Sequence, residues 1–160
     1  MNAVQNPVYL IASIFSVTFV VGLLDAAISD FRSFRIPNRI PLLLLASFPP
    51  VAILDGFTVH DWWIHAAVAA SLFAISIVLF AGRLWGGGDA KLLPAVGLWI
   101  GLNGLSRFLV VMSAAGCVLA CAAMLIRVLP LATSLRSRQI PYGLAIAAGG
   151  LDWWIGVTWR

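Results

Sequence analysis

The side chains in this sequence most able to do chemistry are two aspartates. All six acidic residues are Asp, and Asp30 and Asp89 lie in short polar segments between long apolar runs. Two carboxyl groups held close together do not both ionise easily, so they share a proton, and one acts as a base while the other acts as an acid. Such a pair can activate water for attack on a peptide carbonyl and protonate the departing amine. This chemistry is that of an aspartic protease and needs no metal and no cofactor.

The surroundings of these aspartates allow a functional and a structural interpretation. Asp89 follows three glycines, Gly86 to Gly88, which would let the backbone run close to an extended substrate and adopt conformations closed to other residues. In the structural interpretation, Asp30 is a solvated loop acid beside Arg32, and Asp89 stabilises the N-terminus of a helix. Composition alone favours the structural interpretation for both residues.

Other titratable residues carry weaker signals. Asp25 lies inside the first apolar run, where ionisable residues are functional by default. Its offset of five from Asp30 places the two on different helix faces, so Asp25 is expected at the water boundary or paired with Arg32. His60 and His65 have no partner pattern, and we assign neither a role.

The elements that must position these residues are membrane helices. The chain is 62% hydrophobic and 10% charged, whereas soluble domains have about 25% charged residues. A spanning helix needs roughly 20 apolar residues, so 160 residues allow about six spans and no separate soluble domain. We predict an all-α, polytopic membrane helical bundle that forms a single transmembrane domain over residues 1–160. The net charge of +4 does not indicate nucleic-acid binding, since the basic residues form no clustered face.

Polar and glycine-rich gaps set the limits of the expected spans. These are about Pro7–Ala27, Ile36–Leu54, Trp62–Gly82, Leu92–Leu105, Phe108–Ile126 and a last span that begins at Pro141. A loop is expected around Asp30, and Asn38 is expected to cap the second helix, with Pro37 tolerated at its start. The run Leu92–Leu105 would cover only about 21 Å of a core roughly 30 Å thick, so a re-entrant segment is an alternative there.

The basic residues sort these gaps into two sets. Eight of the ten fall after the first, third and fifth spans: Arg32, Arg35, Arg39, Arg83, Lys91, Arg127, Arg136 and Arg138. Arg107 and Arg160 fall in the opposite set. Because cytoplasmic gaps are rich in Lys and Arg, we predict that both termini lie outside and the odd-numbered gaps lie in the cytoplasm. Asp30 and Asp89 then lie at similar depth on the cytoplasmic face.

Two segments, DFRSFRIPN at residues 30–38 and GGGDAKL at residues 86–92, resemble the type IV prepilin peptidases. In that family the first catalytic aspartate lies seven residues before the proline of an Ile/Leu-Pro-Asn/Asp element, and the second ends a GxGD motif followed by Lys-Leu. The segment that begins at Pro141 is similar to the family's proline-led last helix. The resemblance implies that Asp30 and Asp89 are catalytic. It also implies that other residues shape the site: Pro37, Asn38, Gly86, Gly88, Lys91 and Pro141.

The resemblance carries further expectations about partners and location. Substrates would be prepilins or pilin-like proteins, whose short leader is removed at the cytoplasmic face of the bacterial inner membrane, and the pilus-assembly machinery is a possible partner. Longer family members carry an N-terminal segment with paired CxxC motifs and also methylate the new amino group. This chain resembles the short form associated with Tad/Flp-type pili, so peptidase activity is implied without methyltransferase activity.

Two other functions are weighed against this one. Presenilin-type and signal-peptide-peptidase-type proteases share only Gly86 to Asp89 with this chain and cut within a transmembrane segment. A small transporter or pilus-assembly subunit would use Asp25, Asp30 and Asp89 for proton relay or partner binding, without peptide cleavage. An internal inverted repeat would favour a transporter, and the two halves contain no convincing one.

Overall fold

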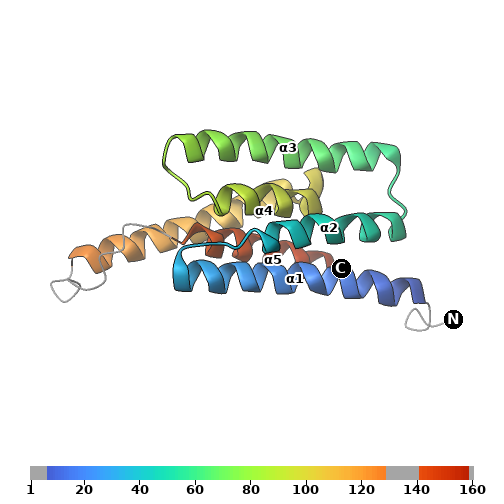
Figure 1. Cartoon of the computed structure of the whole chain (residues 1–160), viewed down its shortest axis with the longest axis horizontal. Helices are drawn as coiled ribbons and strands as arrows, with labels where there is room; N and C mark the ends of the chain where they lie inside the picture. The colour runs from blue at the N-terminus through green and yellow to red at the C-terminus, as the bar shows by residue number, and fades with distance from the viewer. Residues whose placement is uncertain (1–6, 129–140, 159–160) are drawn as a thin grey trace.

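The computed structural model of the chain describes residues 7–128 and 141–158, and these residues form helices without any strand. The helices are α1 (Pro7–Ser33), α2 (Arg39–Leu54), α3 (Val59–Ala81), α4 (Asp89–Val128) and α5 (Tyr142–Thr158). They lie roughly parallel to the long axis of the molecule (Figure 1). The prediction of an all-helical bundle is therefore confirmed for the described part of the chain.

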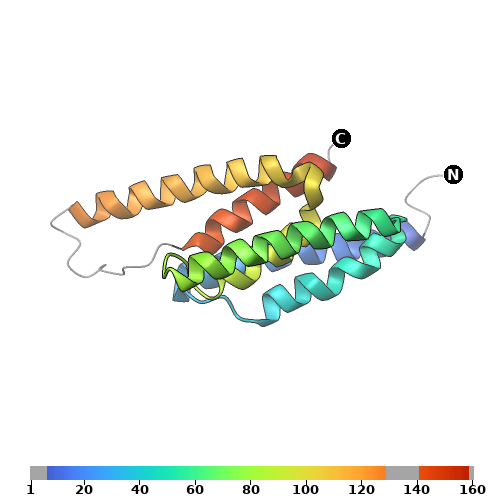
Figure 2. The same cartoon turned by 90° about the horizontal axis from the view of Figure 1, so that it is seen from above.

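The long helix α4 contains a reversal of direction. Gly101, with φ 62° and ψ −171°, is not helical, and the segments on either side of it run in opposite directions (Figure 2). The boundary predicted between Leu105 and Phe108 is wrong, because the chain turns where a glycine permits a backbone conformation closed to other residues. The first segment, Asp89 to Ile100, rises only about 18 Å. The second segment is the longer of the two.

A histidine supports this reversal from the neighbouring helix. The Nδ1 atom of His65, on α3, lies 2.7 Å from the carbonyl oxygen of Leu98, which comes just before the break. A hydrogen bond here requires the tautomer with a proton on Nδ1. The ring also packs against Phe48 and Phe57, with centroids 5.6 and 4.9 Å away. His65, to which the sequence assigned no role, therefore helps to hold the turn in α4.

Replacing Gly101 with alanine is expected to destabilise the fold more than the same change at Gly56. Both have positive φ, but a Cβ atom at residue 101 would clash with the imidazole ring of His65, whereas one at residue 56 would meet nothing within 4 Å. We expect Gly101→Ala to lower the free energy of unfolding by roughly 2–5 kcal/mol and Gly56→Ala by about 1 kcal/mol. Unfolding in detergent micelles measures both. Equal losses would contradict a specific role for the contact with His65.

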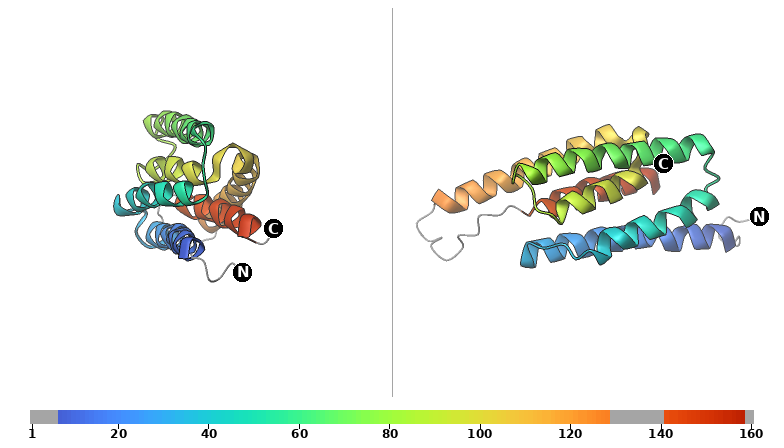
Figure 3. Two further views of the ribbon diagram at one scale, coloured as in Figure 1. Left: turned by 90° about the vertical axis from the view of Figure 1, so that its right-hand side faces the viewer. Right: turned by 45° about the horizontal axis from the view of Figure 1, so that its top comes forward.

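The helices pack around α4 and α5. α4 contacts α2, α3 and α5, while α1 contacts α2 and α5, and the end-on view shows this arrangement (Figure 3). The core contains side chains at most 1% exposed, among them Phe19, Leu23, Leu44, Val96 and Ile146. α5 thus connects the packing of α1 with that of α4.

The outer faces of the helices are apolar. Val59–Ala81 and the Asp89–Ile126 part of α4 are each long and apolar enough to cross a membrane, although Gly101 divides the second. Large apolar side chains such as Val78 and Val110 are about two-thirds or more exposed. A soluble monomer rarely exposes so much apolar surface, which indicates a membrane protein. That all six helical segments cross the bilayer stays a prediction.

Candidate active site

Asp30 and Asp89 come from two helix ends at the same end of the bundle. α1 continues to Ser33, so Asp30 lies in its last turn and the loop predicted around it is wrong. Asp89 is the first residue of α4. The two residues are only 4% and 6% exposed, and their carboxyl groups interact electrostatically. The fold therefore brings together the two aspartates that the sequence singled out.

A backbone amide from α5 holds the first of these carboxyl groups. The N–H of Gly143 donates to Asp30 Oδ2 at a distance of 2.7 Å, and it also interacts with the carboxyl of Asp89. A hydrogen bond to an ionised carboxylate is stronger than a hydrogen bond between two neutral groups, so it holds the carboxylate more firmly. Gly143 therefore sets the orientation of Asp30 relative to Asp89. The contact joins residues 113 positions apart in the chain.

One carboxyl oxygen of Asp89 is left without a partner in the described part of the chain. Its Oδ1 atom is buried and has no hydrogen-bond partner among the described residues. Buried polar atoms are nearly always paired, and an exception calls for an explanation such as a catalytic role or a bound water molecule. An acceptor oxygen in this position is able to take a proton from a bound water molecule. Together with Asp30, it supplies the two acid–base groups that peptide hydrolysis requires.

Close packing at the glycines holds the pair together. A Cβ atom on Gly88 would lie 2.9 Å from Ile36 Cβ, and one on Gly143 would lie 2.8 Å from Ile36 Cδ1. Ile36 is thus the point at which the three motif segments meet. The unusual backbone conformations predicted for Gly86 to Gly88 are not found, because the glycines with positive φ among the described residues are Gly56 and Gly101. Residue 88 is a glycine because a larger side chain would collide with Ile36.

The remaining predicted site residues lie around the pair. Lys91 Nζ donates to Asn38 Oδ1 at 2.9 Å, which links α4 to the start of α2. Asn38 occupies the N-cap position of α2, but its side chain makes no capping hydrogen bond, so that prediction is wrong. The half-buried prolines Pro37 and Pro141 precede α2 and α5. The carbonyl of Pro141 accepts from the N–H of Leu144 and so begins the helix that carries Gly143.

Asp25 is not part of the pair. Its side chain is 46% exposed and lies 3.5 Å from Arg39, which is 75% exposed. The prediction that Asp25 pairs with Arg32 is wrong, since its partner is Arg39. An exposed ion pair at this distance contributes little to stability. The shorter ion pair, with atoms 2.7 and 2.9 Å apart, joins Arg107 to Asp152 between α4 and α5.

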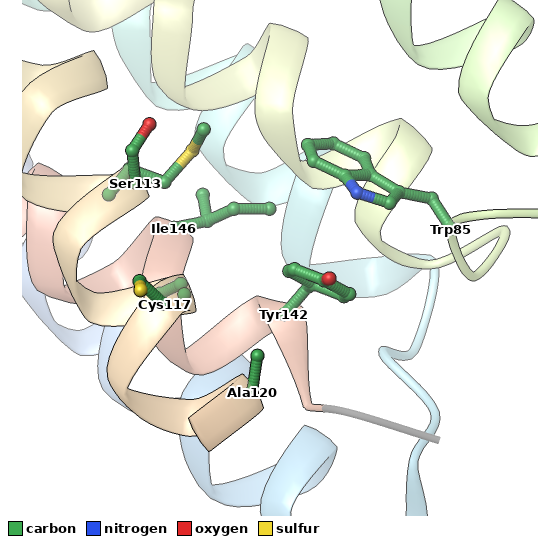
Figure 4. A pocket seen from close by; sticks show the side chains of 9 residues that line it. Trp85, Ser113, Cys117, Ala120, Tyr142 and Ile146 are labelled. Carbon is green, nitrogen blue, oxygen red and sulfur yellow. The ribbon is translucent and has the colours of Figure 1, made fainter. Parts of the chain in front are cut away.

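An aromatic pair and a cavity lie where the segment before α4 meets the start of α5. The rings of Trp85 and Tyr142 stack with centroids 5.7 Å apart beside a cavity of about 330 Å³ between α4 and α5 (Figure 4). The sequence analysis missed these two residues. Their positions, Trp85 directly before Gly86 and Tyr142 directly before Gly143, could have indicated that they lie near the site. Among the described residues, no three Asp, Glu, His or Cys side chains gather in a way that could hold a metal ion.

The sequence model of the type IV leader peptidase family matches residues 17–125 of the chain. The matched range includes both aspartates and ends before α5. No curated protein and no solved structure matches the chain.

Proposed function

The chain belongs to the type IV leader peptidase family, and we propose that it cleaves the leader of prepilin-type substrates with Asp30 and Asp89 as its catalytic pair. The observation that carries this proposal is the burial of both carboxyl groups, from separate helices, within electrostatic range of each other. A pair that stabilised only helix ends would gain nothing from this proximity, since two like charges repel when both are ionised.

In the proposed reaction the two carboxyl groups divide the work. The ionised one removes a proton from water, and the water oxygen bonds to the scissile carbonyl carbon while the protonated one donates to the carbonyl oxygen. Collapse of the tetrahedral intermediate breaks the C–N bond, and a proton passes to the departing amine. The N–H of Gly143 keeps Asp30 in place throughout. The pair titrates as a unit, so the roles belong to the pair and not to a fixed residue.

We further propose that the six helical segments span the bacterial inner membrane, with the aspartates at the cytoplasmic face. Exposed basic residues support this orientation, because several of them lie on the segments that lead to and from the pair: Arg32, Arg35, Arg39, Arg83 and Lys91. Such clusters are typical of the cytoplasmic side. Arg136, Arg138 and Arg160 lie outside the described residues. The short Tad/Flp type and cleavage without methylation also belong to this proposal.

The test is co-expression of the chain with a Flp-type prepilin, followed by measurement of the substrate mass. We expect loss of the leader, without the added mass of a methyl group, only when the chain is present. The matched control is the same prepilin with its cleavage site replaced. An uncut prepilin beside folded, membrane-inserted chain would contradict the proposal and favour the proton-relay or assembly-subunit alternative.

A further inference from the structure

The backbones of α2 and α3 hardly approach each other, although α4 packs against both. The end-on view shows α2 and α3 on either side of the first segment of α4 (Figure 3). Toward one end, aromatic side chains fill the space between the two helices. Phe48 of α2 packs against Trp62 and His65 of α3, with centroids 5.6 Å apart in each case. The gap is therefore closed at the end remote from the aspartates.

Toward the aspartates the same gap is open. It forms an apolar groove of about 510 Å³ lined by α2, α3 and the first segment of α4. Its walls include Leu42 and Leu45 of α2, Ala70 and Phe73 of α3, and its floor includes Pro94 of α4. Leu42, Leu45 and Phe73 are 62%, 42% and 48% exposed. No side chain of the described residues fills the space between these walls.

The polar end of the groove is formed by residues that follow the two aspartate segments closely in the sequence. Its polar lining residues are Asn38 and Lys91, which are hydrogen-bonded to each other. Lys91 follows Asp89 by two residues, and Asn38 follows Ile36, the residue on which Gly88 and Gly143 pack, by two. A chain that left the aspartates would therefore enter the groove across these two side chains.

We propose that this groove binds the apolar helix of the substrate, in particular its first two turns after the cleaved bond. The inference rests on the proposed leader-peptidase function. The groove extends along α2 from Asn38 to Leu45, which is about 10 Å, or two helical turns. Its lining suits an apolar helix, since small and apolar side chains permit close helix contact within a membrane. The aromatic cluster around Phe48 limits how far the helix can extend.

Filling the groove with a large side chain is expected to slow the cleavage of a substrate that has an apolar helix and to leave unchanged the cleavage of a substrate that lacks one. Ala70→Trp places a large ring in the groove, and Ile75→Trp places the same ring on an exposed part of α3 outside it. We expect Ala70→Trp to slow cleavage of the full prepilin by at least about tenfold, with cleavage of a short leader peptide unchanged. Ile75→Trp is expected to leave both rates unchanged.

The outcomes separate the two proposals. If the wild-type chain cleaves neither substrate, the proposed function fails. If the wild type cleaves the prepilin and Ala70→Trp cleaves it equally fast, or loses both substrates equally, the groove inference is overturned.

A photoreactive benzoylphenylalanine gives a second measurement that needs no short peptide. It is placed at Phe73 in the groove or at Ile75 outside it, each in an Asp89→Asn background that retains uncut substrate. An adduct with the apolar helix of the prepilin from position 73, and none from position 75, supports the inference. An adduct with lipid alone, or equal adducts from both positions, overturns it.

Discussion

Replacing Asp30 or Asp89 with asparagine is expected to lower the rate of leader cleavage by about 10²–10⁴-fold for either change. Each variant loses one of the two groups that move protons in the reaction, and a positioned acid or base contributes a factor of this size. Asparagine keeps the shape of the side chain and a carbonyl oxygen that can still accept from Gly143. The rate is measured with purified protein and a prepilin in detergent micelles.

The matched control for these variants is Asp25→Asn on the same helix as Asp30. Asp25 is half exposed, and among the described residues its ion pair is the long one with Arg39, so its loss should change the rate less than threefold. Thermal unfolding of all three variants checks that they are folded. Substantial cleavage by a folded Asp30 or Asp89 variant would remove that residue from the pair.

The sequence predicted which aspartates meet, but not how they are held. The count of basic residues predicted that Asp30 and Asp89 lie on the same side of the membrane, because charge placement follows membrane topology and needs no knowledge of packing. The contact between Gly143 and Asp30 could not be derived in this way. It joins α1 to α5 across the whole chain, and only the resemblance at Pro141 indicated that α5 belongs to the site.

Two errors have a common physical origin. The loop expected around Asp30 is the last turn of α1, and the reversal expected after Leu105 occurs at Gly101. In a chain this apolar, polarity changes mark where helices meet water and not where they end. Helices surrounded by lipid also need no single apolar stripe, so periodicity does not identify their contact faces. The groove between α2 and α3 could not be predicted from the sequence, because the contact faces of these two helices could not be identified.

Replacing Gly143 with alanine is expected to lower the turnover rate by about tenfold to a hundredfold, with KM nearly unchanged. The added Cβ atom would lie 2.8 Å from Asp30 Oδ2 and 3.0 Å from Asp30 Cβ. The side chain of Ile36 would lie 2.8 Å from the same Cβ atom, so both Ile36 and the carboxyl group of Asp30 must shift, and Asp30 would lose its alignment with Asp89. We expect KM to change little, because the groove proposed for the substrate is lined by α2, α3 and α4 and includes no residue of α5. Steady-state kinetics separates the two parameters.

Gly116→Ala is the matched control, because Gly116 also lies where α4 faces α5 but its nearest neighbour would be 3.7 Å from the new Cβ atom, an ordinary contact. Alanine favours a helix over glycine by about 1 kcal/mol, which offsets part of the packing strain in Gly143→Ala. Both variants should therefore fold, and only Gly143→Ala should lose turnover. A Gly143→Ala protein that turns over as fast as Gly116→Ala would show that close packing of residue 143 against Asp30 is not needed for the alignment of the pair.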